Sequence, residues 1–204
     1  MTLVNDAAAP PLRVHVARPD DAPHLTYALA RAFHDDPVFR WFSPDDGRRR
    51  VMLPGLFAVF VGAFLRHGEA YADDGAAGAA LWAGPGVDPI SSDPDAGGRL
   101  AAVAGIDAPR LFAIVEALEA RTPAEPHHHL QFLGVVPERQ GAGLGGALMA
   151  PVLARCDRDG AAAYLEATSE RNRALYERYG FRAHGSIRVP DGPVLHRMWR
   201  DPVR

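Results

Sequence analysis

The residues best suited to chemistry form one glycine-rich run, Arg139-Gln140-Gly141-Ala142-Gly143-Leu144-Gly145-Gly146, which separates a predicted strand from a predicted helix. Closely spaced glycines let the backbone curl so that several N–H groups point into one concavity. The missing Cβ atoms also let a ligand approach closely. Such a concavity at a helix N-terminus binds phosphate or pyrophosphate. The run therefore predicts an anionic ligand, held by the N–H groups of Gly141 to Gly146 with Arg139 or Gln140 beside it.

The same glycines satisfy G-x-G-x-x-G, and Glu166 lies 20 residues after Gly146, as in a dinucleotide-binding fingerprint. Two observations oppose a dinucleotide. Four residues, 137–140, separate the strand from the first glycine, whereas a dinucleotide turn follows its strand at once. The run also lies too far along the chain to leave room for the remaining βαβ units. The other alternative is a tight structural turn that binds nothing.

A second motif, Asn172-Arg173-Ala174-Leu175-Tyr176-Glu177-Arg178-Tyr179-Gly180-Phe181, begins 27 residues after Gly145. It resembles the N-x-x-x-Y-x-x-x-G-F marker of the GNAT superfamily of acetyltransferases. The run from Gln140 to Gly145 resembles that superfamily's Q/R-x-x-G-x-G/A signature. Both motifs occur in the expected order, each after a predicted strand. The resemblance implies an acetyl-CoA-dependent N-acetyltransferase.

The resemblance narrows to puromycin N-acetyltransferase and its relatives at residues 133–137, 165–168 and 189–193, and it covers most of the chain. The sequence departs from those enzymes at residues 39–43 and 84–105. In such folds this half shapes the acceptor pocket. The acceptor therefore cannot be carried over from the resemblance.

Pantetheine amides need partners on a strand, and the resemblance implies the backbone of Leu133, Val135 and Val136, where the central sheet splays. We expect the N–H of Val135 to face the thioester carbonyl as an oxyanion donor. Gly134 suits a β-bulge that opens this strand.

Two side chains are expected to move protons. Tyr176 occupies the acid position that the resemblance implies, and a phenol with a pKa near 10 stays protonated at neutral pH. Asn172 lies four residues earlier on the same helical face and would contact the cofactor. The alternative for Tyr176 is a core aromatic residue with a satisfied hydroxyl.

Glu166, at a predicted strand end, is the expected base, acting on the amine directly or through water. The alternative for this carboxylate is a loop cap. Gln131 lies where the relatives can carry a carboxylate, and an amide cannot accept the proton. This leaves Glu166 as the stronger candidate for the base.

Two other features suggest chemistry that we do not predict. His127, His128 and His129 invite a metal reading, but adjacent side chains on a strand alternate between faces, so the three cannot converge on one ion. We expect no metal site, although one of these histidines could lie near the acceptor. Cys156 is the only cysteine, and we expect it to be buried packing, because direct attack by the amine needs no enzyme nucleophile.

Hydrophobic periodicity and turn residues predict the elements that must position these groups. Strands are expected at residues 12–16, 69–72, 77–83, 130–136, 162–167, 181–189 and 194–199. Helices are expected at 20–33, 48–66, 108–120, 144–158 and 170–179, with a loop at 84–98. The apolar stretch 51–65, interrupted by Pro54, Gly55 and Gly62, is too short to span a bilayer and is expected to be a buried helix.

Length and composition bound the remaining choices. The chain has 204 residues and a formal net charge of -3, and all 22 basic residues are arginine. This predicts one domain over residues 12–204 after a disordered lead-in at 1–11, without a signal peptide. Neither nucleic acid nor a membrane is expected as a partner. A single cysteine favours the cytoplasm.

The sequence thus predicts a mixed α/β GNAT fold whose largely antiparallel sheet, flanked by helices, splays between residues 130–136 and 162–167. The predicted reaction is direct attack of an amine on acetyl-CoA in a ternary complex. A small-molecule amine, such as an amino-nucleoside or another antibiotic-like compound, is the first acceptor. Alternatives are a peptide or protein amine, a non-catalytic acyl-CoA sensor and a dinucleotide-dependent enzyme. The protein is expected to be a monomer or a homodimer.

Overall fold

The computed structural model describes residues 12–203, so the predicted lead-in at 1–11 lies outside the described residues. The strands are β1 Val14–Val16, β2 Glu69–Asp73, β3 Gly78–Ala83, β4 His127–Val135, β5 Ala162–Ala167, β6 Arg182–Arg188 and β7 Val194–Arg200. The α-helices are α1 Ala22–Phe33, α2 Pro37–Phe42, α3 Asp46–His67, α4 Ala96–Ala104, α5 Ala108–Glu119, α6 Leu144–Asp159 and α7 Glu170–Glu177. Short 3-10 turns η1 Pro19–Asp21, η2 Gly105–Asp107 and η3 Pro137–Arg139 complete the list.

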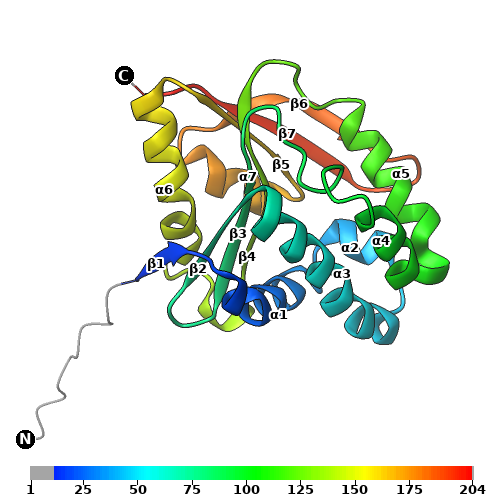
Figure 1. The fold of residues 1–204 in the computed structure, drawn as a ribbon. Coiled ribbons are helices and arrows are strands. Elements are labelled where there is room, and N and C mark those ends of the chain that lie inside the picture. The colour runs from blue at the N-terminus through cyan, green and yellow to red at the C-terminus, as the bar shows by residue number, and fades with distance from the viewer. Residues whose placement is uncertain (1–11, 204) are drawn as a thin grey trace, which may run out of the picture.

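The strands form one sheet in the order β1-β2-β3-β4-β5-β7-β6. All neighbouring pairs are antiparallel except β4 and β5, which are parallel. Helices α1 and α3 pack on the half of the sheet that contains β2, β3 and β4, and α6 also contacts these strands (Figure 1). The predicted α/β fold with a largely antiparallel sheet is confirmed.

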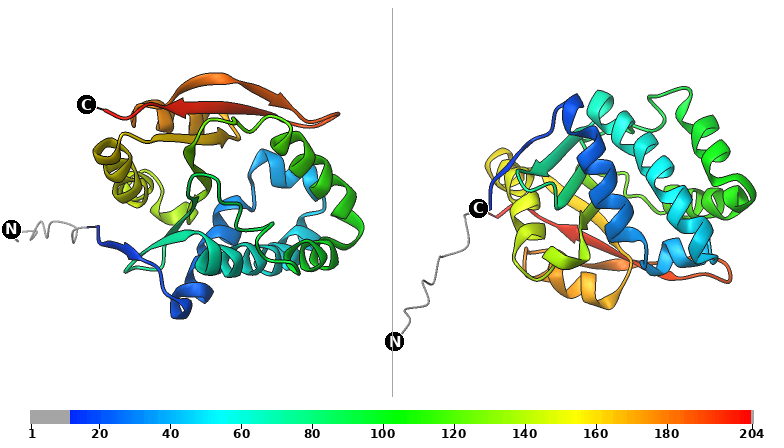
Figure 2. Two further views of the ribbon diagram at one scale, coloured as in Figure 1. Left: turned by 45° about the horizontal axis from the view of Figure 1, so that its top comes forward. Right: turned by 90° about the horizontal axis from the view of Figure 1, so that it is seen from below.

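Two helices were absent from the sequence prediction, namely α2 and α4. Asp36 does more than end α1, because its carboxylate accepts a hydrogen bond from the N–H of Val38 at 2.8 Å and so caps α2, with Pro37 in the first turn. Helix α4 begins inside the segment 84–98 that was predicted to be a loop. Helix α5 contacts both α4 and β6, and Figure 2 shows it beside the β6–β7 hairpin.

Helix α3 is continuous for 22 residues, through Pro54, and is therefore longer than the predicted apolar stretch. Among the described residues it is the one helix whose length and composition would suffice to cross a membrane, with a mean hydropathy of 1.3. Half of that window is buried inside the protein. It contacts α1 and α4 along the core, so the predicted buried helix is confirmed.

The sheet opens between β4 and β5. Pairing joins only His127–Leu130 to Ala162–Leu165, and the rest of β4 has no β5 partner. The predicted splay is therefore confirmed. The predicted bulge is displaced, because the register with β3 shifts at Gln131, which lies between the paired residues Leu130 and Phe132.

Gly134 has a different role from the predicted bulge. A Cβ at this position would lie 2.9 Å from both Ala32 Cβ and Leu29 Cδ2. Its absence lets α1 lie close against β4.

Candidate active site

The glycine run forms an open turn before α6. Gly141 and Gly143 have φ values of 79° and 84°, in the left-handed region that glycine adopts readily. Gly143 is the N-cap residue, and the first N–H bonded back to it is that of Ala147, at 3.1 Å. No atom lies within 4 Å of a Cβ built at Gly141. The turn is therefore open to a ligand, at the end of α6 that favours an anion.

Gly146 serves packing rather than ligand access. A Cβ there would lie 1.6 Å from the Tyr179 hydroxyl oxygen. Tyr179 thus occupies the space above this turn of α6, and Gly146 is buried. The second sequence motif supplies the residue that makes glycine necessary in the first.

Gln140 connects the turn to the strand edge. Its side-chain amide donates to the Val135 carbonyl oxygen at 3.0 Å, and its own Oε1 accepts from Arg171 at 3.3 Å. Arg139 and Arg171 are both exposed beside the turn. Arg171 is a cation that the sequence analysis missed, although it directly precedes Asn172.

The strand edge that faces the splay presents Leu133 and Val135. The N–H of Val136 donates to Ala77 O on the β3 side at 2.8 Å, and its carbonyl oxygen accepts from Arg139 N at 2.9 Å. Backbone N–H and C=O groups alternate in direction along a strand. The backbone groups of Val135 and Leu133 therefore point away from β3, toward the gap between β4 and β5. Val136 is therefore not the free strand-edge group that we expected.

A cavity of about 860 Å³ begins at this splay and extends beneath the loop after β3. Six phenylalanines line it from α1, α2, α3 and β4: Phe33, Phe39, Phe42, Phe60, Phe64 and Phe132. Leu133, Glu166, Asn172 and Tyr176 line the same cavity. The structure thus brings the predicted acid, the predicted base and part of the predicted cofactor edge to one space.

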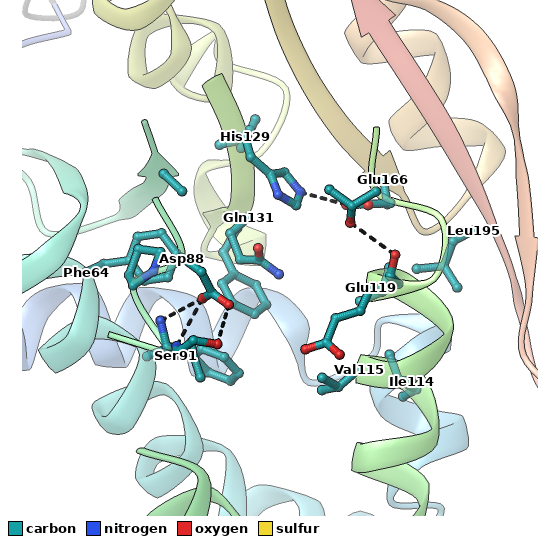
Figure 3. Close-up of a pocket in the computed structure, with 18 of the residues that line it drawn as sticks. Phe64, Asp88, Ser91, Ile114, Val115, Glu119, His129, Gln131, Glu166 and Leu195 are labelled. Atoms are coloured by element: carbon teal, nitrogen blue, oxygen red, sulfur yellow. Dashed lines mark hydrogen bonds and ion pairs between the residues drawn. The ribbon is translucent and has the colours of Figure 1, made fainter. Parts of the chain in front are cut away.

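Glu166 is held by a histidine. His129 Nε2 lies 2.9 Å from Glu166 Oε2 (Figure 3). A carboxylate oxygen can only accept, so the proton lies on Nε2. The Glu166 side chain is 7% exposed, and its other oxygen, Oε1, is buried without a partner in the described part of the chain. A buried carboxylate oxygen left without a donor is costly and marks a place for a donor from a ligand.

Tyr176 has its ring in the core and lines the cavity. The ring packs against Phe181 with a centroid distance of 6.0 Å, and no hydrogen bond to the hydroxyl is found within residues 12–203. Burial, reinforced by the negative charge of Asp36, raises the pKa of Tyr176 above its usual value near 10. The hydroxyl therefore stays protonated at neutral pH, as a proton donor must.

A polar chain lies beside Tyr176. Asn172 Nδ2 donates to Thr168 Oγ1 at 3.2 Å, and the Thr168 hydroxyl donates to Asp36 Oδ2. Burial raises the pKa of Asp36 above the usual range of an aspartate. The chain orients Asn172, whose predicted contact is with the cofactor, and it links α7 to the start of α2. Sequence reasoning missed Asp36 and Thr168, because they are distant in sequence.

The three consecutive histidines separate as strand alternation requires. The His127 and His129 rings share one face, with centroids 5.9 Å apart, and both line the cavity. Burial lowers the pKa of His127, so this ring is neutral at pH 7. Cys156 is buried on α6, as expected. Within residues 12–203, the side chains that come close enough together to hold a metal ion are His34, Asp35 and Asp46, away from this cavity.

Comparison with known proteins assigns the family. The model of the acetyltransferase (GNAT) domain matches residues 110–201. An uncharacterized N-acetyltransferase of Schizosaccharomyces pombe is 30% identical over 172 residues, which cover 78% of this chain and 70% of the relative. The chain therefore belongs to the GNAT superfamily of acetyltransferases, whose members use acetyl-CoA as co-substrate.

Solved structures agree with this assignment. A protein from Corynebacterium glutamicum described as histone acetyltransferase HPA2 and related acetyltransferase is 31% identical, with a TM-score of 0.72 over 95% of this chain and 97% of the other. Arylalkylamine N-acetyltransferase 2 from Aedes aegypti shares the fold, with a TM-score of 0.63, 13% identity, and coverage of 94% and 99%. The finer resemblance to puromycin N-acetyltransferase stays a prediction.

Proposed function

We propose that this protein transfers the acetyl group of acetyl-CoA to an amine of a small molecule, by direct attack in a ternary complex. The observation that carries the proposal is the single cavity that Glu166 and Tyr176 both line, opening at the β4–β5 splay. The open turn at Gly141 and the N–H groups at the start of α6 fit the pyrophosphate of coenzyme A. Acetyl-CoA would supply an acetyl group activated as a thioester.

Glu166 accepts a proton from the ammonium form of the acceptor, because only an uncharged amine attacks. Its buried Oε1 is the free oxygen, and His129 fixes the carboxylate through Oε2. The new bond forms between the amine nitrogen and the acetyl carbon, and the carbon–sulfur bond breaks. Tyr176 gives its proton to the departing sulfur, and the N–H of Val135 faces the oxygen that gains charge.

A small-molecule acceptor is favoured over a protein amine by the cavity itself. About 860 Å³ lined largely by apolar side chains fits one small ligand. The fold neighbour from Aedes aegypti is named for arylalkylamines, which supports an amine attached to an apolar group.

The test is a panel of amines with acetyl-CoA, including puromycin, agmatine and β-phenethylamine, followed by release of free thiol. We expect turnover of at least one amine. Glu166→Gln should lower kcat/KM about 100-fold at pH 7, and the defect should shrink as the pH approaches the pKa of the amine. The matched control is Glu177→Gln, because Glu177 is exposed on α7 and does not line the cavity.

Two results would contradict the proposal. No thiol release with any amine, combined with normal calorimetric binding of acetyl-CoA, would favour a sensor. No binding of acetyl-CoA or CoA would remove the enzymatic assignment of the glycine turn. A pH-independent defect in Glu166→Gln would remove the base role alone.

A further inference from the structure

We infer that the acceptor is a cationic amine with an apolar body and no carboxylate, and that Glu119 is a side chain that enforces this charge preference. The inference rests on the proposed function, since it concerns the amine that occupies the same cavity. It adds that the acceptor carries no carboxylate, and it names a residue on α5 that the reaction itself does not require.

The charge lining the cavity has one sign. Besides the Tyr176 phenol, its ionisable side chains are four carboxylates and two imidazoles, namely Asp88, Glu119, Glu125, Glu166, His127 and His129. No arginine is among the described residues that line it, and the chain contains no lysine. An acceptor that carries a carboxylate would thus enter a negative cavity without a cation to pair with.

Glu166, the most buried of these carboxylates, has one oxygen without a hydrogen-bond donor. Glu166 Oε1 is buried and has no partner within residues 12–203, and the side chain is 7% exposed. An ammonium group placed there satisfies the oxygen and its charge together. A carboxylate on the neighbouring carbon of the acceptor would instead face Glu166 where water is largely excluded, and like charges repel more strongly there than in water.

The floor of the cavity is aromatic. Phe132 packs against Phe33, Phe57 and Phe60 with centroid distances of 5.6, 5.3 and 4.8 Å. Phe39 and Phe64 extend the same surface. These rings offer apolar contact to an acceptor body and almost no hydrogen bonds. A short polar polyamine would leave this surface unused.

Glu119 is a free carboxylate that α5 carries into the cavity. Asp88 is engaged by its own turn, because it accepts from the N–H of Ile90 at 2.9 Å and from the N–H of Ser91 at 3.2 Å. The Glu119 side chain has no hydrogen bond or ion pair within residues 12–203, and neither has that of Glu125, which lies in the segment between α5 and β4. Figure 3 shows its side chain reaching from α5 into the cavity, on the side opposite Asp88, with Gln131 beyond it.

The test uses a matched pair of acceptors, β-phenethylamine and phenylalanine, which differ only by the carboxylate. We expect kcat/KM to favour β-phenethylamine by at least about 100-fold. Glu119→Arg should reduce this ratio about tenfold, because it places a cation in the cavity. Glu116→Arg is the control: Glu116 is exposed one turn earlier on α5 and does not line the cavity. It makes the same change in net charge and should leave the ratio unchanged.

Equilibrium binding of the same pair in the presence of CoA separates this inference from the proposed function. Comparable turnover of phenylalanine would overturn the charge preference while leaving the acetyltransferase activity intact. If neither compound is acetylated, tighter binding of β-phenethylamine still supports the inference, and equal or absent binding overturns it. Equal effects of the Glu119→Arg and Glu116→Arg substitutions would remove the role of Glu119.

Discussion

In the proposed reaction the two substrates bind two differently built regions of the protein. The cofactor region, from β4 through α7, offers mainly backbone: the turn at Gly141, the start of α6 and the free edge of β4. The acceptor region, from α2 through α5, offers side chains, chiefly phenylalanines and carboxylates. A binding site built from backbone groups requires glycine at fixed positions, and these positions can be recognised as a sequence motif. A binding site built from side chains can be formed by many combinations of residues, so no sequence motif marks it.

The largest effect on turnover is expected from removing the hydroxyl of Tyr176, the side chain of the cofactor region to which we assign a step of the reaction. Tyr176→Phe deletes the proposed proton donor while keeping the ring against Phe181. We expect kcat to fall about 100-fold, with the dissociation constant of acetyl-CoA unchanged by calorimetry. Unchanged turnover would make Tyr176 a packing residue only.

The pH dependence sharpens this prediction. Burial and the charge of Asp36 raise the pKa of Tyr176 above its usual value near 10. The hydroxyl therefore remains protonated as the pH rises from about 6 to about 9.5, below that usual value. The ratio of wild-type kcat to Tyr176→Phe kcat should stay constant over this range. A ratio that falls with rising pH would mean that the phenol ionises earlier than its burial implies.

The next largest effect tests whether glycine in the motif is needed for ligand access or for packing. Gly146→Ala places a methyl group where the Tyr179 hydroxyl lies, so we expect a loss of about 1–3 kcal/mol of unfolding free energy. Gly145→Ala is the matched control, because its Cβ would meet Leu133 and Leu175 at 3.8 and 3.9 Å, ordinary contact distances. Denaturant unfolding measures both. Equal destabilisation would refute the packing role of Gly146.

The candidate site could be predicted from the sequence only in part. The glycine run predicted the open turn, because that turn depends on local backbone geometry. The splay and the position of Tyr176 were implied by the family resemblance, and Glu166 was proposed from its place at a predicted strand end. His129 was considered as a metal ligand and as a neighbour of the acceptor, but not as a partner of Glu166. Its bond to Glu166 joins residues 37 apart on two strands, and pairing register is a tertiary property.

The errors in the prediction have physical causes of the same kind. Gly134 was assigned to the bulge because of its residue type, whereas its position is required by contact with α1. Val136 was predicted to be free, but its N–H donates to the carbonyl oxygen of Ala77, the residue before β3, and no motif describes this contact. Helix α2 is six residues long and depends on a capping carboxylate and on packing rather than on its own periodicity.

The smallest effect belongs to the acceptor region. Phe112 lines the cavity from α5 and is 43% exposed, so Phe112→Ala should cost little stability. We expect the KM of an apolar amine to rise roughly threefold to tenfold, with acetyl-CoA binding unchanged. The control is Ile106→Ala, because Ile106 is 79% exposed and does not line the cavity. A change in cofactor affinity in the Phe112 variant would break the separation between the two regions.

The register shift at Gln131 makes the arrangement depend on chain length more than on side-chain identity. At the shift, β4 has one residue more than β3, and this extra residue follows directly after Leu130, the last residue of β4 that pairs with β5. Substituting Gln131 would leave that spacing intact. Deleting it would place Leu130 directly before Phe132 and remove the bulge, so the later residues of β4 would keep their faces and their β3 partners, while the extra bend at the point where β4 leaves β5 would be lost. The bend of β4 at the splay therefore depends on the presence of this inserted residue and not on which side chain the residue carries.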